Sequence, residues 1–267
     1  MKHVENTGWH GWPADAPPPA IAPFDAAAAE THQEAWADYL GLPIEKDITM
    51  PGGEKLTLIL IPPGEFLMGS TAEEQARALE EAKATNDTWA VTNIPSEGPQ
   101  HRVRITKPFY LGKYEVTQAQ WRSLMGTNPS EFKDSPRHPV EQVSWGDIQS
   151  FLVKLNDGAS AWKMTFALPT EAQWEYACRA GTTTPYYGGE SEDDLRGYGW
   201  FGKNAGGTTH AVGELEPNAF GLYDMHGNLW ERCADWYAED YYTNALMDDP
   251  TGPLAGTARV TRGGVWT

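Results

Sequence analysis

Residues 218–231 read NAFGLYDMHGNLWE, and this stretch is typical of the last third of the chain. Gly221 and Gly227 interrupt any helix or strand of ordinary length. The aromatic side chains around them supply more apolar surface than a disordered segment carries. The same mixture of helix breakers and aromatic residues begins at Gly181. We therefore expect irregular loops that pack against one another, with the aromatic side chains as their core.

The composition of the whole chain agrees with such a fold. The 267 residues are 40% hydrophobic and include 12 Trp, 27 Gly and 20 Pro, which favours a turn-rich α+β protein over a helical bundle or a regular barrel. A net charge of −17 repels nucleic acid and anionic membranes. We expect cations, or neutral or basic peptides, as partners, although the acidity is also explained by solubility alone. No apolar run reaches the roughly 18 residues that span a bilayer, and no signal peptide is recognisable.

Upstream of the loop region the sequence divides into three parts. Residues 1–24 are rich in Pro and Ala and predict an extended linker. Residues 25–47 predict a short helical lead-in, with Asp25 as its N-cap and Gly41 as its stop. The main domain is expected to cover residues 48–267.

Capping boxes predict the helix starts inside the main domain. In this motif a Ser or Thr and the residue three positions later each bond the other's backbone. The four candidates are Ser70 with Glu73, Thr117 with Gln120, Ser144 with Asp147, and Thr170 with Gln173. Alternating residues predict strands over 55–70, which we expect to form a hairpin that turns at Pro62 and Pro63, and again over 101–116.

Six separated motifs follow one another in a characteristic order. They are IPPGEFLMGS (61–70), PFYLGKYEVTQAQW (108–121), HPVEQVSWGDIQSFLVKLN (138–156), LPTEAQWEYACRAG (168–181), NAFGLYDMHGNLWE (218–231) and RGG-W (262–266). From about Ile48 to Thr267 the chain thereby resembles the formylglycine-generating enzyme family, also called the sulfatase-modifying factor family. The resemblance implies a variant of the C-type lectin-like fold, an α+β fold with little regular secondary structure.

Two classes of function follow from the resemblance. One is a copper-dependent oxidase that converts a cysteine of a sulfatase peptide to formylglycine. The other is a non-catalytic binding or regulatory module in a larger bacterial-type protein, with a peptide or protein as its ligand. The oxidases carry two catalytic cysteines and a terminal strand after RGG-W, so the resemblance implies a chain that is incomplete at its C-terminus. Copper is then expected only if the missing part carries the cysteine pair.

The two cysteines of the chain do not match the catalytic pair. Cys178 matches a structural cysteine whose family partner lies near the C-terminus. Cys233 matches no catalytic position, and we expect a buried free thiol. We therefore expect no catalytic and no cofactor-binding residue within the chain.

Three positions depart from the family pattern. Val265 stands where the family has Ser, and valine cannot form a hydrogen bond with a thiolate, a substrate or bound oxygen. Ala167 replaces the usual Arg, and Arg232 replaces a common Trp. These changes are compatible with the fold and favour the binding module over the oxidase.

The resemblance also implies one structural calcium ion. Its ligands would be two carboxylates and two backbone carbonyls, from Asp224, Gly227, Leu229 and Glu231. Calcium prefers oxygen ligands of these kinds, and a glycine allows the tight bend that turns carbonyls inward. The alternative is that the two carboxylates cap turns or pair with Arg232 and Arg179.

The sequence lacks the motifs of iron sites, hydrolases and nucleotide-binding proteins. The seven histidines are scattered, and no pair has the helical spacing expected of an iron site. The chain contains no G-x-S-x-G of a hydrolase, no Walker loop and no dinucleotide-binding glycine motif after a strand.

Overall fold

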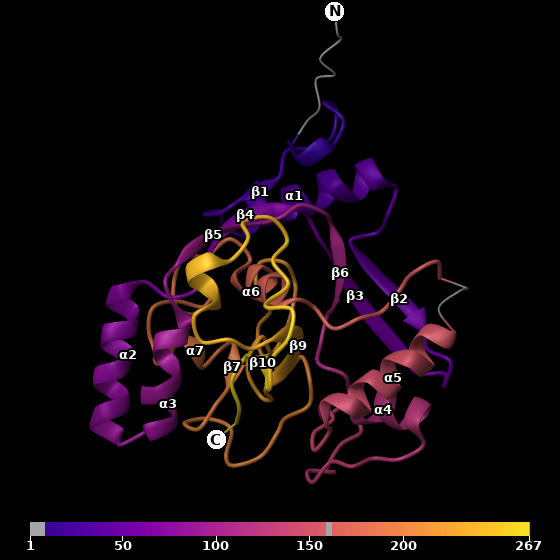
Figure 1. Cartoon of the computed structure of the whole chain (residues 1–267). Coiled ribbons are helices and arrows are strands. Elements are labelled where there is room, and N and C mark those ends of the chain that lie inside the picture. Colours follow the sequence, from indigo (N-terminus) through magenta and orange to yellow (C-terminus); the bar gives the residue numbers. More distant parts are fainter. Residues whose placement is uncertain (1–8, 159–161, 267) are drawn as a thin grey trace, which may run out of the picture.

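The computed structural model describes residues 9–158 and 162–266. Small sheets and helices are mixed in it, which confirms the expected α+β class. Helix α6 (Glu171–Arg179) lies near the middle of the molecule, where it contacts strands of two sheets. Figure 1 shows the other main helices around it: α1 (Ala26–Leu40), α2 (Ala72–Thr85), α3 (Thr88–Asn93), α4 (Gln118–Met125) and α5 (Trp145–Asp157). In the described ranges no helix is both long and apolar enough to cross a membrane.

Two three-stranded sheets form the N-terminal half. One is antiparallel and has the order β2 (Glu45–Thr49), β3 (Lys55–Ile61), β6 (Phe109–Gly112). In the other, β4 (Gly64–Met68) is parallel to β1 (Ala20–Ile21) and antiparallel to β5 (His101–Ile105).

The loop region after α6 contains only short regular elements, as expected. Strand β7 (Gly199–Trp200) is parallel to β8 (His226–Gly227), and β9 (Glu231–Trp236) is antiparallel to β10 (Arg259–Arg262). The region also contains the short helical turns α7 (Glu192–Leu195) and η4 (Tyr241–Asn244).

The predicted hairpin around Pro62 and Pro63 is wrong. The two strands that flank these prolines belong to different sheets, because β3 pairs with β2 and β6 while β4 pairs with β1 and β5. A proline donates no backbone hydrogen bond and holds the preceding residue in an extended conformation. The two prolines therefore carry the chain from one sheet to the next, and the carbonyl of Pro63 accepts a hydrogen bond from the amide of Ala20 (2.9 Å).

The predicted linker is also wrong for residues 9–24. Ala20 is fully buried in strand β1, and the Trp12 indole nitrogen donates to the carbonyl of Thr106 (3.0 Å). The segment folds against α1, where the buried Trp36 donates to the carbonyl of Pro18 (3.1 Å). Its tryptophans and alanines carry enough apolar surface to be packed, although its prolines suggest a spacer. Residues 1–8 lie outside the described part of the chain.

The helical lead-in exists, but it is not separate from the domain. Asp25 caps α1 through the amide of Ala28, and Gly41 ends it in the left-handed conformation, as predicted. Strand β2 already begins at Glu45, so the expected boundary at residue 48 falls inside a strand.

Three of the four predicted capping boxes are confirmed, at the starts of α4, α5 and α6. The fourth lies one residue later, at Thr71 with Glu74. Thr71 is the N-cap, and the hydroxyl of Ser70 instead donates to the carboxylate of Glu97 (3.1 Å). The helix that follows, α2, lies on the surface as expected.

The buried apolar residues form two clusters. The larger surrounds α6 and includes Phe66, Tyr176 and Phe220. The smaller lies between the β2–β3–β6 sheet and helices α4 and α5, where the rings of Trp121 and Phe151 stack 5.1 Å apart.

Candidate functional site

The backbone of residues 224–231, hereafter the 224–231 loop, is tightly bent. Asp224, Gly227 and Asn228 all have positive φ angles, of 57°, 85° and 57°. Glycine adopts this conformation freely, and Asn and Asp tolerate it better than other residues do. The amide of Gly227 donates to the carbonyl of Gly263 (2.8 Å), and the amide of Asn228 donates to the carbonyl of Trp200 (2.8 Å). The loop is thereby tied to β7 and to the RGG-W segment.

The two carboxylates of the predicted calcium site lie in this loop. Asp224 is 2% exposed; its Oδ2 accepts from the amide of Gly213 (2.8 Å), while Oδ1 is buried without a donor among the described residues. Burial raises the pKa of Asp224 to about 6. Glu231 is partly buried, and burial, together with the charge of Asp224, raises its pKa to about 7. An unpaired buried carboxylate oxygen is costly, so the loop carries negative charge that lacks compensation.

The alternative roles predicted for these carboxylates were to cap turns or to pair with Arg232 and Arg179. The structure supports this alternative only in part. Arg179 pairs with Glu175 (2.8 Å), and within the described ranges neither arginine named in that alternative forms an ion pair with Asp224 or Glu231. The bond from Gly213 does resemble turn capping. No three His, Cys, Asp or Glu side chains of the described residues form a group that could hold a metal ion. The predicted set consists of two carboxylates and two carbonyls, and it stays a prediction.

Glu115, which the sequence reasoning did not single out, contacts the loop directly. Its Oε2 accepts from the side-chain amide of Asn228 (2.8 Å), and its Oε1 accepts from the backbone amide of Leu229 (3.1 Å). Burial raises its pKa well above the usual range, and the charges of Asp224 and Glu231 add to this effect. The charges of these three carboxyls influence one another, although among the described residues they form no group of side chains that could hold a metal ion. Glu115 belongs to the motif of residues 108–121, but nothing local in the sequence links it to a loop more than a hundred residues away.

Both cysteines are free and buried, which confirms the expected burial of Cys233. Burial raises the pKa of both thiols, so they are poor nucleophiles. Cys178 lies 3.8 Å from Nε2 of His226, and this nitrogen accepts from the amide of Tyr187 (3.3 Å). Burial lowers the pKa of His226 to about 3, so its ring is neutral and does not stabilise a thiolate. The expected disulfide partner of Cys178 stays a prediction.

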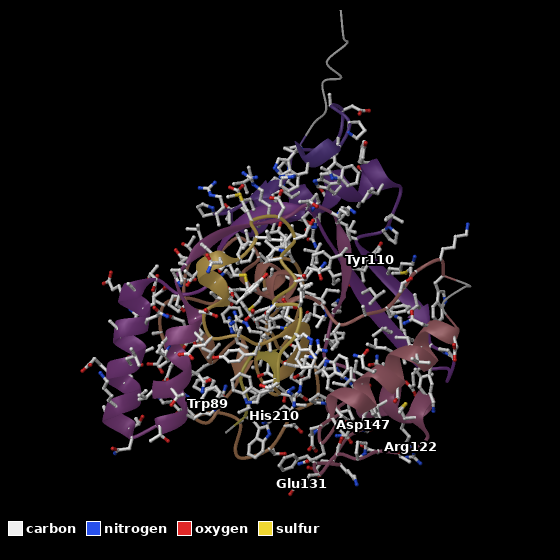
Figure 2. All side chains as sticks on the ribbon, in the orientation of Figure 1. Trp89, Tyr110, Arg122, Glu131, Asp147 and His210 are labelled. Atoms are coloured by element: carbon white, nitrogen blue, oxygen red, sulfur yellow. The ribbon has the colours of Figure 1, made fainter. Side chains whose placement is uncertain are left out.

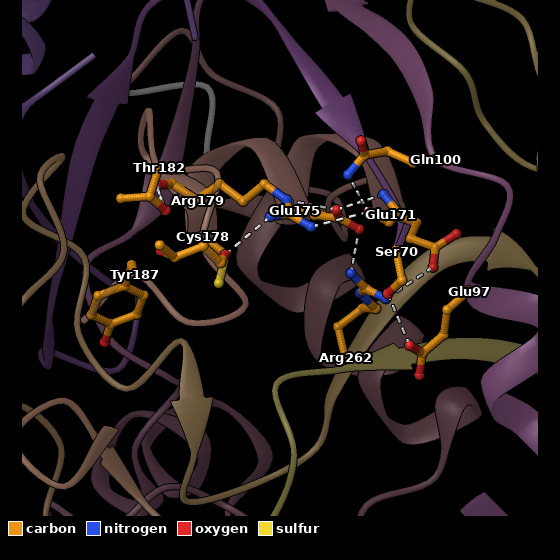
Figure 3. Close-up of polar contacts among 12 residues, drawn as sticks. Ser70, Glu97, Gln100, Glu171, Glu175, Cys178, Arg179, Thr182, Tyr187 and Arg262 are labelled. Atoms are coloured by element: carbon orange, nitrogen blue, oxygen red, sulfur yellow. Dashed lines mark hydrogen bonds and ion pairs between the residues drawn. The ribbon is translucent and has the colours of Figure 1, made fainter. Parts of the chain in front are cut away.

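A buried ion network joins the RGG-W segment to α6 (Figure 3). Glu175 accepts from Arg179 (2.8 Å) and from the amide of Gly69 (2.8 Å), and it also pairs with Arg262. Arg262 lies 3.7 Å from Glu171 as well. The arginine of RGG-W therefore acts as a structural cation between β10 and α6.

A groove of about 750 Å³ lies beside the 224–231 loop. Residues of β3, β6, α4 and α5 line it, together with residues 229–232, Val265 and Trp266. The ring of Trp266 packs edge-to-face on Phe132 (5.1 Å). All three positions that depart from the family pattern, Ala167, Arg232 and Val265, line this groove.

Most residues that line the groove are apolar, and most of its charged residues are acidic. Four carboxylates line it, from Glu115, Glu131, Glu141 and Glu231, against the single cation of Arg232 in the same lining. Figure 2 shows Glu131 at the lower edge of the molecule, on the segment that follows α4. An extended ligand with apolar and basic groups would match this surface.

Comparisons with known proteins were made on sequence and on structure. A model of the sulfatase-modifying factor enzyme 1-like domain matches residues 49–267. A formylglycine-generating enzyme of Thermomonospora curvata is 37% identical over 164 residues, which cover 56% of this chain and 51% of the relative. The chaperone protein LppX of Paenibacillus barcinonensis is 31% identical over 212 residues, 59% of this chain and 69% of LppX. The serine/threonine-protein kinase pkn1 of Chlamydia caviae is 36% identical over 249 residues, but these cover only 35% of the kinase.

Two solved structures are similar over most of the chain. The Treponema denticola variable protein 1 has a TM-score of 0.69 and 28% identity, and the match covers 84% of this chain and 88% of that protein. PvdO from Pseudomonas aeruginosa has a TM-score of 0.65 and 24% identity, with coverage of 83% and 86%. The chain spans about half the length of the formylglycine-generating enzyme that it matches in Thermomonospora curvata.

Proposed function

The chain belongs to the sulfatase-modifying factor family, and from this premise we propose that it is a binding module that holds a basic peptide segment in its groove and is stabilised by one calcium ion. The two similar solved structures confirm the fold class expected from the sequence. Membership alone does not set the activity, because one fold carries many functions.

The observation that carries the proposal is the convergence of the three family departures on one groove. Ala167, Arg232 and Val265 come from separate parts of the chain and line the same surface. Val265 lacks the hydroxyl of the Ser that the family has at this position. Ala167 lacks the positive charge of the family's usual Arg. Changes confined to a ligand surface alter what is bound while the core is retained, which supports a divergent binding function over the family's oxidation chemistry.

The charge of the groove selects the ligand. Even without Glu115 and Glu231, whose pKa values burial raises, Glu131 and Glu141 outnumber the single arginine of the lining, and the whole chain carries a charge of −17. Such a field attracts cationic partners and repels anionic ones. Aromatic side chains such as Trp266 supply faces for apolar or cationic groups.

Binding of a Cys-x-Pro-x-Arg peptide tests this function and separates it from the oxidase. We expect the peptide to bind at least ten times more tightly than its Arg→Glu variant, by calorimetric titration at low ionic strength, and its affinity to fall with added salt. Trp266→Ala is expected to weaken binding about tenfold or more, because buried aromatic anchors dominate such interfaces. Tyr237→Ala, an exposed aromatic outside the groove lining, is the control.

Equal affinity for the two peptides, or no binding at millimolar peptide, would contradict the groove function. The oxidase alternative rests on the similarity to enzymes named formylglycine-generating enzyme. With copper(I) and oxygen present, mass spectrometry of the same peptide decides it. An intact thiol is expected, because neither Cys178 nor Cys233 matches the catalytic pair, and conversion to an aldehyde would overturn the binding-module proposal.

Calcium would be held by the carboxylates of Asp224 and Glu231 and the carbonyls of Gly227 and Leu229. The buried Oδ1 of Asp224 without a donor fits this role, because a hard cation would satisfy it and offset the charge of Glu231. The ion would supply no catalysis here and would hold the loop together.

Calcium is therefore expected to raise the melting temperature of chelator-treated protein. At a concentration one hundred times the Kd the stabilisation is about 2.7 kcal/mol. Glu231→Gln is expected to abolish this increase, while Glu80→Gln on the exposed face of α2 leaves it unchanged. Absence of binding at millimolar calcium in a titration, or equal binding by Glu231→Gln, would remove the site.

A further inference from the structure

We infer that Glu115 is the residue that positions the 224–231 loop for calcium. This inference rests on the calcium site proposed above and adds a residue to it. Glu115 lies outside the loop, on the connection between β6 and α4, and it contributes no atom to the predicted ligand set.

The contacts of Glu115 fix the part of the loop that lies between the two predicted carbonyl ligands. Its Oε1 accepts from the backbone amide of Leu229 (3.1 Å). Because a peptide unit is planar and trans, this bond sets the orientation of the whole peptide plane between Asn228 and Leu229. The carbonyls of Gly227 and Leu229 belong to the two neighbouring peptide planes, so this bond restrains the backbone torsions that join those planes to the fixed one.

Asn228 connects Glu115 and the loop to a third segment of the chain, at His210. Its side-chain amide donates to Glu115 (2.8 Å) and to the carbonyl of His210 (3.3 Å), and its Oδ1 accepts from the amide of His210 (3.0 Å). Asn228 is fully buried and has a positive φ of 57°. A non-glycine residue keeps this conformation only where its surroundings determine it, and Glu115 supplies one of these determining bonds.

The carboxyl group of Glu115 is engaged by the loop and not by a cation. In the described part of the chain it forms no ion pair with a Lys or Arg. Both of its oxygens are already engaged by donors of the loop. It therefore acts through Asn228 and Leu229 and is a positioning residue. Partners of this kind, which orient metal ligands, typically change metal affinity ten- to a hundredfold when mutated.

Calcium titration of the Glu115→Gln variant, by calorimetry on chelator-treated protein, tests the inference. Gln retains an oxygen that accepts from Leu229, but it offers Asn228 an amide in place of an acceptor and carries no charge. We expect calcium affinity to fall ten- to a hundredfold, while the calcium-free variant still melts cooperatively with its circular dichroism spectrum unchanged. Glu65→Gln, which removes a buried carboxylate of β4 that pairs with Arg102 and Arg104, is the matched control with an unchanged Kd.

Glu115→Asp is the second variant, since it retains the charge and is one methylene too short to reach both donors. It is expected to lose at least threefold in affinity, and it provides the test if Glu115→Gln does not fold. Calcium affinity equal to that of the unaltered protein in the folded variants would overturn the inference, as would equal losses of melting temperature with and without calcium. Failure of the unaltered protein to bind calcium would instead refute the calcium site.

Discussion

Replacement of Gly227 by alanine is expected to destabilise the protein by about 2–5 kcal/mol, the sum of a left-handed backbone and a forced contact. Gly227 has a φ of 85°, and a Cβ added there would lie 2.0 Å from the carbonyl oxygen of Trp200. The contact is with backbone, in the strand that pairs with β8, and the same carbonyl accepts from the amide of Asn228. Neither atom can move without breaking the pairing.

Gly221 provides the matched control for this substitution. It has nearly the same φ, 84°, but a Cβ added there would meet no atom within 4 Å. Gly221→Ala should therefore cost only the backbone strain of about 1–2 kcal/mol. Urea denaturation of the two variants measures the difference. Equal free energies of unfolding would show that the loop relaxes around the methyl group and that close packing does not require Gly227.

The second large effect is expected for Arg262→Met, at about 3–5 kcal/mol, the typical result of removing one partner from a buried ion pair. Arg262 pairs with Glu175, whose side chain is 3% exposed, and lies near Glu171. Methionine keeps much of the volume but leaves Glu175 with Arg179 as its remaining ion-pair partner among the described residues. The control is Arg196→Met, which breaks an exposed pair with Asp193 and should cost less than about 1 kcal/mol.

The pH dependence of this loss provides a further check. Burial raises the pKa of Glu171 from 4.5 to about 7. A carboxyl whose folded pKa is raised contributes stability at low pH, which is lost as the pH rises between these two values. Without the charge of Arg262, which lowers that pKa, the loss should be greater at pH 8 than at pH 5. Unfolding free energies that are equal to those of Arg196→Met at both pH values would contradict the structural role of the network.

Local interactions are what the sequence reveals most directly. The capping boxes at Thr117, Ser144 and Thr170, and the cap and stop of α1, are confirmed because they depend on residues only a few positions apart. The one displaced box illustrates the limit of such reasoning. Ser70 has the required side chain, but it bonds Glu97, which is 27 residues away.

Strand partners and the role of the N-terminal segment depended on contacts that are distant in sequence. The predicted turn at Pro62 and Pro63 joins two sheets, since β4 finds its parallel partner in Ala20–Ile21. Alternation of apolar residues reveals that a strand exists but not which edge it pairs with, because backbone hydrogen bonds carry no sequence information.

For the site, the order and spacing of motifs were enough to predict the family, the irregular aromatic region and the loop that carries Asp224 and Glu231. The folded structure was needed to show that Glu115 bonds a loop 113 residues away, that the partly exposed Arg262 lies between carboxylates, and that Ala167, Arg232 and Val265 share one groove. The physical reason is that a hydrogen-bond donor or a charge is a property of one residue, whereas its partner and its burial are set when distant segments of the chain close on one another.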